Sequence, residues 1–112
     1  MQTIQNAIDG HKVKSASRRM APIYNPATGE QTAELPFSTV EDVNAAVAAA
    51  KKAAIGWGAT PPLKRIKHMF RFKELLDRHA NEIASLISKE HGKTHADALG
   101  ELARGIDVVD FA

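Results

Sequence analysis

The sequence contains no cysteine, and this absence excludes several kinds of chemistry. Disulfide bonds, thiolate metal sites and cysteine nucleophiles all need that side chain, so these 112 residues can supply none of them. Long apolar runs are also missing: no stretch approaches the roughly 20 residues of a membrane span. The N-terminus lacks a basic region followed by an apolar one, the pattern of a secretory leader. We therefore expect a cytoplasmic protein that does not bind membranes.

A strong charge of either sign is missing as well. Lysine and arginine total 15 against 13 acidic residues, a formal net charge of +2. This excess is too small to predict nucleic-acid binding. The hydrophobic fraction of 44% is ordinary for a globular protein, and the length allows one modest domain.

The first part of the chain, residues 1–36, has the pattern of short strands and turns. Asp9-Gly10 is typical of a two-residue hairpin turn, and Asn25 to Glu30 forms a second turn signal in which Gly29 can take a positive φ. The expected strands are Ile4–Ile8, Lys12–Ser15, Ala21–Tyr24 and Gln31–Leu35. They contain few large apolar residues, so we expect them to lie against another part of the protein.

Residues 37–112 have a helical period. Ser38 and Glu41 form a capping box, and Val40 to Ala54 carry an alanine-rich face that predicts close packing against a neighbouring helix. Gly56-Trp57-Gly58 is expected to end this first helix.

The second predicted helix begins with Thr60 as its cap and Pro61 at its first position. It is expected to be long, with one apolar stripe at Leu63, Ile66, Phe70, Leu76, Ile83 and Ile87. His91-Gly92-Lys93 is expected to stop it, and Thr94 to cap a third helix. That helix has an apolar tip and no stop signal, so we expect a longer chain of which this is the front part.

Several groups of residues are candidate sites. Gly92-Lys93-Thr94 resembles a phosphate loop, but Ile87 stands where the motif needs glycine, which favours a plain helix–helix turn. His91, His95 and Asp97 have a possible metal-ligand spacing, interrupted by Gly92.

A basic group and a tryptophan complete the surface candidates. Phosphate contact is one interpretation of the basic group and a solvated helix face is the favoured one. The group consists of Lys64, Arg65, Lys67, His68, Arg71 and Lys73. Trp57 lies between two glycines, and we expect it to pack at a helix end rather than to bind a ligand.

Arg104 is the candidate with the most specific chemistry. It lies away from the apolar positions of the last helix, and a guanidinium can hold a carboxylate with two hydrogen bonds. Spacing alone favours a simpler role, an intrahelical pair with Glu101 three residues earlier.

The order of these segments resembles the start of an NAD(P)-dependent aldehyde dehydrogenase. The landmarks are the hairpin at Asp9-Gly10, the turn from Tyr24 to Glu30, the helix followed by Gly56-Trp57, Glu90 to Lys93, and Ala98 to Glu101. The resemblance covers essentially the whole chain. It implies an α/β fold of which this segment, short strands and a hairpin followed by three helices, is the N-terminal portion of the NAD-binding domain.

Two stretches, Ala59 to Leu76 and Gly100 to Val109, are similar to the methylmalonate-semialdehyde dehydrogenase branch. That resemblance implies a CoA-acylating reaction in which a cysteine attacks the aldehyde, hydride goes to NAD, CO2 is lost and coenzyme A takes the acyl group. It also implies that Arg104 faces the substrate tunnel and holds the substrate carboxylate.

The resemblance further implies what this chain needs from elsewhere. The family's nucleophilic cysteine, general-base glutamate and cofactor loops belong to later parts of the protein, so we assign no catalytic, cofactor or metal residue here and expect no activity or tight NAD binding from this chain alone. The expected partners are the remainder of the chain and, in the complete enzyme, other subunits of a homotetramer. The alternatives are another aldehyde dehydrogenase, such as a succinate-semialdehyde type, and a non-enzymatic helical adaptor with a basic face.

Overall fold

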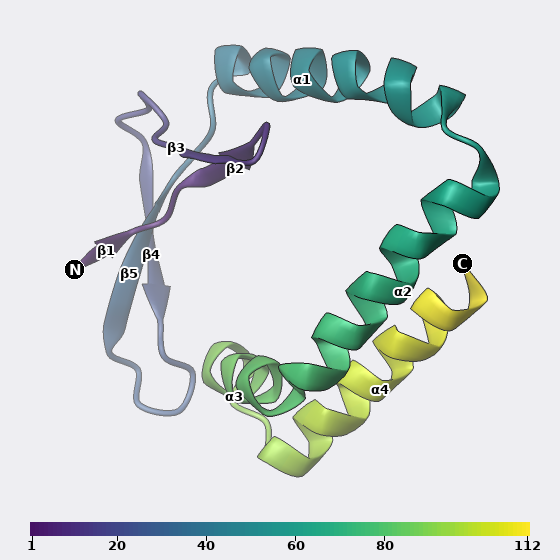
Figure 1. The fold of residues 1–112 in the computed structure, drawn as a ribbon. Coiled ribbons are helices and arrows are strands. Elements are labelled where there is room, and N and C mark those ends of the chain that lie inside the picture. Colours follow the sequence, from purple (N-terminus) through teal and green to yellow (C-terminus); the bar gives the residue numbers. More distant parts are fainter. The chain divides into compact units, whose positions relative to one another are not determined.

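A computed structural model describes residues 1–112 and divides them into two compact units. The first unit contains residues 1–25 and 29–59, and the second contains residues 26–28 and 60–112. Figure 1 shows short strands followed by helices, which confirms the predicted fold class. The number of helices was wrong, because the structure has four where the sequence predicted three.

The first unit holds five strands and one helix. The strands are β1 (Gln2–Thr3), β2 (Asn6–Ile8), β3 (His11–Val13), β4 (Met20–Tyr24) and β5 (Gln31–Pro36), and the helix is α1 (Val40–Ala59). One sheet has the order β1-β5-β4, with β1 parallel and β4 antiparallel to β5. The parallel strand β1 was not predicted, since a two-residue strand has no periodicity to detect.

The predicted turns of the first unit are confirmed. Strands β2 and β3 form an antiparallel hairpin in which Asp9 and Gly10 both have positive φ, at 52° and 75°, as a tight two-residue turn requires. The turn between β4 and β5 is closed by the backbone N–H of Asn25, which donates to the carbonyl of Glu30 at 2.8 Å. Gly29 in this turn has φ 74°.

The N-terminus of α1 is capped, but one residue later than predicted. The Asp42 backbone N–H donates to the Thr39 hydroxyl at 3.2 Å, and the Thr39 N–H donates to the Asp42 carboxylate at 2.8 Å. This is a reciprocal capping box. Ser38 instead contacts the side chain of Asn6 at 3.1 Å, so Thr39 and Asp42 replace Ser38 and Glu41 in the predicted role.

Helix α1 also runs further than predicted. It continues through Gly56, Trp57 and Gly58 to Ala59, because a glycine in a helix costs about 1 kcal/mol but does not forbid it. Within the first unit α1 lies against β2, not against another helix, and none of its residues is buried. Trp57 is 47% exposed, so the first unit does not bury it as expected.

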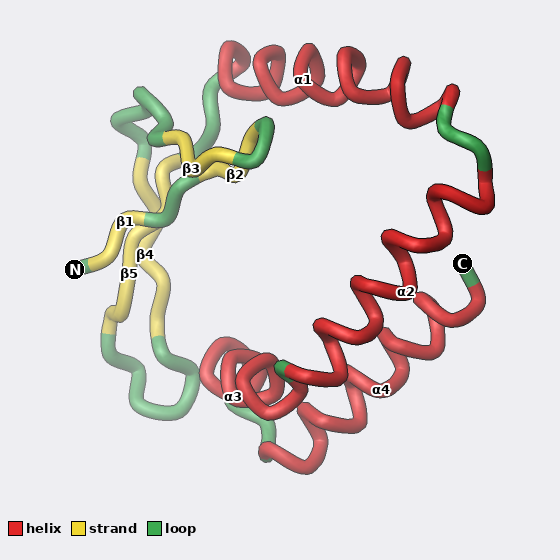
Figure 2. The backbone as a smooth tube through the Cα atoms, viewed as in Figure 1, coloured by secondary structure: helices red, strands yellow, loops and turns green.

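The second unit is formed by α2 (Pro62–Arg78), α3 (Ala80–His91) and α4 (His95–Phe111). The predicted long helix is therefore two helices, with a break at His79, where φ and ψ are −101° and 17°. In Figure 2 only a short connection separates α2 from α3. Helix α2 begins one residue after the predicted start, with Pro61 and not Thr60 at its N-cap position.

The predicted boundary between α3 and α4 is confirmed. Gly92 ends α3 in the left-handed conformation, with φ 84°, and its N–H donates to the carbonyl of Ser88. Thr94 caps α4 by accepting a hydrogen bond from the Asp97 N–H at 3.2 Å. Helix α4 contacts both α3 and α2, and Figure 1 shows α2 and α4 side by side.

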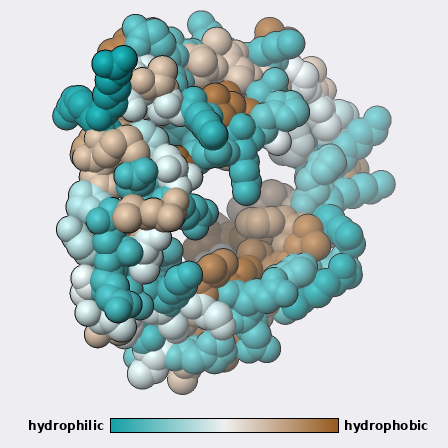
Figure 3. Space-filling model, turned by 90° about the vertical axis from the view of Figure 1, so that its left-hand side faces the viewer, coloured by the Kyte–Doolittle hydropathy of each residue, from teal (hydrophilic) through white to brown (hydrophobic).

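The buried core is small. Its apolar members are Ala33, Ala84, Ala98 and Leu102, and no large side chain is fully buried. Part of the predicted stripe is exposed, with Leu63 at 81% and Phe70 at 66%. Figure 3 shows hydrophobic residues at the surface among hydrophilic ones. None of the helices is long and apolar enough to span a membrane.

Candidate functional site

Helix α4 presents Arg104 on the side opposite its buried face. Ala98 and Leu102 are one turn apart and are the buried residues of this helix. Arg104 comes two residues after Leu102, which is more than half a turn around the helix. Its side chain is accordingly exposed, with Val108, 69% exposed, one turn further on. The candidate site is therefore an arginine on an exposed helix face with an apolar neighbour.

The predicted pair between Glu101 and Arg104 does not form. Glu101 makes an ion pair with Lys93 instead, and the Arg104 guanidinium makes no hydrogen bond or ion pair. The Lys93 ammonium, which donates a hydrogen bond to the carboxylate, lowers the pKa of Glu101, and the nearby charges of His91 and Arg104 act in the same direction with smaller effect. Glu101 is thus held as a carboxylate, with Lys93 as its main partner.

Lys93 lies in the turn between α3 and α4. Its side chain is 20% exposed, the least exposed of the paired lysines and arginines, whose other members lie between 37% and 59%. The preceding Gly92 has no Cβ, and a Cβ there would lie 3.2 Å from Cγ of Pro26. The left-handed φ of Gly92 favours glycine, and an added Cβ would be in tight contact with Pro26.

A second lysine lies near the acidic residues at the end of α4. Lys73 of α2 pairs with Asp110 at 2.5 Å, and the hydrogen bond to Asp110 raises the pKa of Lys73. Asp107 contributes to the same shift through its charge. Asp107 is three residues after Arg104, but the two do not form an ion pair. Both acidic neighbours of Arg104 along the helix are therefore close to lysines from outside it.

The phosphate-loop and metal hypotheses fail on geometry. Gly92, Lys93 and Thr94 connect two helices, whereas a phosphate loop follows a strand, and Lys93 is engaged with Glu101. His91 ends α3 and His95 begins α4, where its Nε2 lies 3.3 Å from the side-chain oxygen of Asn81. No group of three potential ligands comes together. The interpretation as a helix–helix turn is confirmed.

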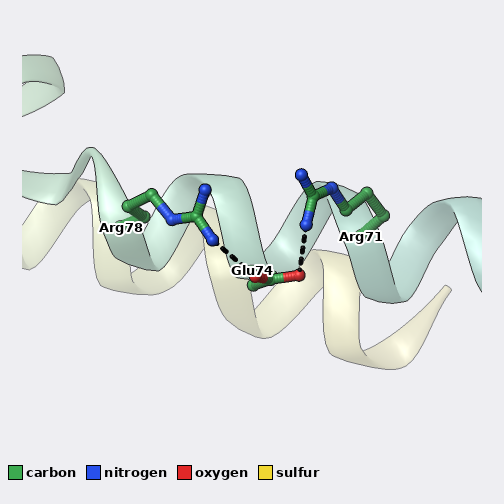
Figure 4. Close-up of polar contacts among 3 residues, drawn as sticks. All are labelled: Arg71, Glu74 and Arg78. Atoms are coloured by element: carbon green, nitrogen blue, oxygen red, sulfur yellow. Dashed lines mark hydrogen bonds and ion pairs between the residues drawn. The ribbon is translucent and has the colours of Figure 1, made fainter.

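Three basic residues of α2 have acidic partners. Arg71 and Arg78 both bond to Glu74, at 2.8 and 2.7 Å, from opposite sides of its carboxylate (Figure 4). Lys73 pairs with Asp110 as described above. These pairs fit the predicted solvated helix face at Arg71 and Lys73, whereas Nε of Arg65 is buried and makes no hydrogen bond.

The sequence predicts Arg104 as a candidate site residue, but it does not predict the ion pair between Lys93 and Glu101. The signal was present in part, because Gly92 was predicted to adopt a left-handed turn. The ion pair between Lys93 and Glu101 joins residues eight apart across that turn, and no periodicity of the sequence marks it.

The chain matches the aldehyde dehydrogenase family over residues 12–112. The chain belongs to this family. The predicted family resemblance is confirmed.

Within the family, the chain is similar to enzymes that act on small semialdehydes. It is 45% identical to malonate-semialdehyde dehydrogenase 1 of Geobacillus thermodenitrificans, with all of this chain and 23% of that protein aligned. The chain therefore spans about a quarter of the length of such relatives.

Two solved structures give the same result at the level of the backbone. The methylmalonate-semialdehyde dehydrogenase of Oceanimonas doudoroffii is 48% identical, with a TM-score of 0.94 over 99% of this chain and 22% of that one. A protein assigned as methylmalonate-semialdehyde dehydrogenase from Sinorhizobium meliloti 1021, complexed with NAD, is 40% identical, with a TM-score of 0.95 over 99% of this chain and 23% of that one.

Proposed function

We propose that this chain forms the N-terminal segment of an NAD-dependent, CoA-acylating malonate- or methylmalonate-semialdehyde dehydrogenase. The overall reaction converts the semialdehyde, NAD⁺ and coenzyme A to acyl-CoA, CO2 and NADH. In this proposal the chain is the front of the NAD-binding domain, the complete enzyme is a homotetramer, and the nucleophilic cysteine comes from outside these 112 residues, which contain none.

The observation that carries the proposal is the state of Arg104. Substrates of this class bear a carboxylate beside the aldehyde, and an arginine recognises a carboxylate through two charge-assisted hydrogen bonds. Arg104 is exposed, makes no ion pair, and lies on a helix that is held by its opposite face. The similarity to malonate-semialdehyde dehydrogenases supports the same substrate class.

The turn between β5 and α1 lacks a feature of nucleotide-binding turns. The passage from β5 to α1 contains Phe37, Ser38 and Thr39 and no glycine, whereas a nucleotide-binding strand–helix turn needs glycines for close approach of the pyrophosphate. The family's NAD would therefore be held by other parts of the enzyme, and the contribution of this segment is to the substrate and the fold.

A hybrid dehydrogenase tests the proposal. In this hybrid, the 112 residues replace the aligned segment of the Geobacillus thermodenitrificans enzyme. The alignment covers all of this chain. We expect NADH formation from malonate semialdehyde to require coenzyme A and to yield acetyl-CoA. A hybrid that releases the free acid without coenzyme A would favour another dehydrogenase type, such as one for succinate semialdehyde.

Arg104→Leu in this hybrid tests the substrate site. Loss of a hydrogen bond to a charged group costs about 1.5–3 kcal/mol, which corresponds to a rise of about 10- to 150-fold in KM for the semialdehyde, and we expect the KM for NAD to change far less. Arg104→Lys is the matched control, because it keeps the positive charge but cannot make two parallel hydrogen bonds to a carboxylate. Its KM for the semialdehyde should lie between those of the parent hybrid and Arg104→Leu. Unchanged kinetic constants in Arg104→Leu would contradict the proposed role.

A further inference from the structure

Arg104 has acidic neighbours at the helical spacing that produces ion pairs, and it pairs with none of them. Glu101 precedes it by three residues, and residues three apart on a helix lie on adjacent parts of its surface. A glutamate on the N-terminal side of a basic residue is also the favourable orientation. The default for this sequence is thus a Glu101–Arg104 pair, which would occupy the guanidinium.

The structure shows what prevents that pair. The Lys93 ammonium holds the Glu101 carboxylate, and Lys93 is the most enclosed cation among the ion pairs of the chain. The turn that carries Lys93 is itself constrained by Gly92 and Pro26. Because the Lys93 side chain is only 20% exposed, holding Glu101 costs less side-chain entropy than in a pair between two fully exposed side chains.

We propose that Lys93 is a positioning residue for substrate recognition: by pairing with Glu101 it keeps that carboxylate away from Arg104, so that the guanidinium is available to the carboxylate of the semialdehyde. This inference rests on the proposed function of Arg104. Its consequence is for specificity, because Lys93 would favour carboxylate-bearing aldehydes and leave uncharged ones unaffected.

The test compares two substrates in the hybrid dehydrogenase. The measured quantity is the ratio of kcat/KM for malonate semialdehyde to kcat/KM for propanal, which has no carboxylate. In Lys93→Met, Glu101 is released and competes for Arg104, and we expect the ratio to fall about two- to fivefold, the range for an ion pair on a protein surface. Lys93→Arg keeps the pair and should keep the ratio.

The double variant Lys93→Met/Glu101→Gln separates positioning from a purely structural role. It lacks the competing carboxylate, so the ratio should return to that of the parent. A ratio that stays low in the double variant would overturn the proposal, because loss of the lysine would then act through the fold. A parental ratio in Lys93→Met would overturn it as well.

Arg104→Leu separates a failure of the substrate site from a failure of this inference. It should lower the ratio by itself, and an unchanged ratio would contradict both the proposed substrate site and the inference. A low ratio in Arg104→Leu together with a parental ratio in Lys93→Met would contradict the inference alone.

Glu101→Gln decides the question if Lys93→Met does not fold. We expect its ratio to equal that of the parent or to be up to about twofold higher. A lower ratio would contradict the proposal.

Discussion

Helices α1 and α4 are both capped by a threonine, but their charged side chains make different contacts. At α1, Asp42 accepts hydrogen bonds from the Ser15 hydroxyl and from the Thr39 N–H, and Thr39 caps the helix in return. At α4, Thr94 makes a single capping bond to Asp97. The charged side chains of that region instead connect Lys93 to Glu101.

The comparison teaches which contacts only hold the fold. At the start of α1, the charge of Asp42 is used to cap the helix and to fasten the loop before β4 to it through Ser15. At α4 the contacts use up a lysine and a glutamate and leave an arginine one turn later without a partner. An arginine whose guanidinium has no ion-pair partner can hold an anion with its planar set of donors.

The largest expected effect concerns the stability of the chain that carries both helices. The buried apolar core consists of three alanines and one leucine, which is too little to offset the conformational entropy of the chain. We expect the isolated chain to melt without a cooperative transition and to give a weak near-UV circular dichroism signal from Trp57.

The hybrid dehydrogenase is the control for that melt and should unfold cooperatively. A sharp transition of the isolated chain, with a fixed environment around Trp57, would instead favour the independent helical adaptor.

A smaller effect is expected from Gly92→Ala, which disturbs the α4 side of the comparison. A left-handed φ costs a non-glycine residue about 1–2 kcal/mol, and the added Cβ would also press on Pro26. The hybrid should therefore lose thermal stability. Gly105→Ala is the matched control, since its Cβ would meet open space within α4. It should stabilise by about 0.5–1 kcal/mol. Equal shifts for the two variants would contradict this reading of the turn.

Asp42→Asn addresses the α1 side. The hydrogen bond from Ser15, and then that from the Thr39 N–H, lower the pKa of Asp42. A carboxylate whose pKa is lowered in the folded state stabilises above its unfolded pKa, about 3.9, and loses that contribution as the pH falls through the folded value. We expect a lower Tm than the parent at pH 7 and a difference that shrinks below about pH 4.

Glu41→Gln is the control for this pH series, because Glu41 lies in the same first turn but takes no part in the cap. A difference between Asp42→Asn and the parent that is constant with pH would show that charge is not what holds this turn.

The smallest effect is expected at the exposed pairs of α2. Glu74 lies between Arg71 and Arg78, and all three side chains are more than half exposed. Glu74→Gln should change the free energy of unfolding of the hybrid by about 0.5 kcal/mol or less. The change should shrink further at 1 M salt. A larger, salt-independent loss would show that this face is buried in the assembled enzyme.

The turns and the cap of α4 could be predicted from the sequence, because a single residue type decides the backbone conformation there. Asp9-Gly10, Gly29 and Gly92 have the positive φ that their turns require, and Thr94 caps α4. Errors arose where neighbours compete. Ser38 and Thr39 can each cap a helix, and the choice follows from contacts made by Asn6 and Ser15, which are distant in sequence.

The break at His79 was missed for a related reason. No glycine or proline marks it, and the apolar period continues across it. In the structure His79 has φ −101° and ψ 17°, and its Nδ1 lies 2.9 Å from the Glu82 carboxylate. The candidate site shows the same limit. The chemistry of Arg104 can be named from its residue type, but the absence of a Glu101–Arg104 pair goes with an ion pair that Lys93 makes with Glu101 across a turn.

The most direct test of the central claim is the substrate preference of the hybrid dehydrogenase with and without Arg104. The account predicts that Arg104→Leu lowers kcat/KM for malonate semialdehyde by about 10- to 150-fold and leaves kcat/KM for propanal within about twofold of the parent. An equal loss for both aldehydes, or no loss for either, would contradict the claim that this segment recognises the carboxylate of the substrate.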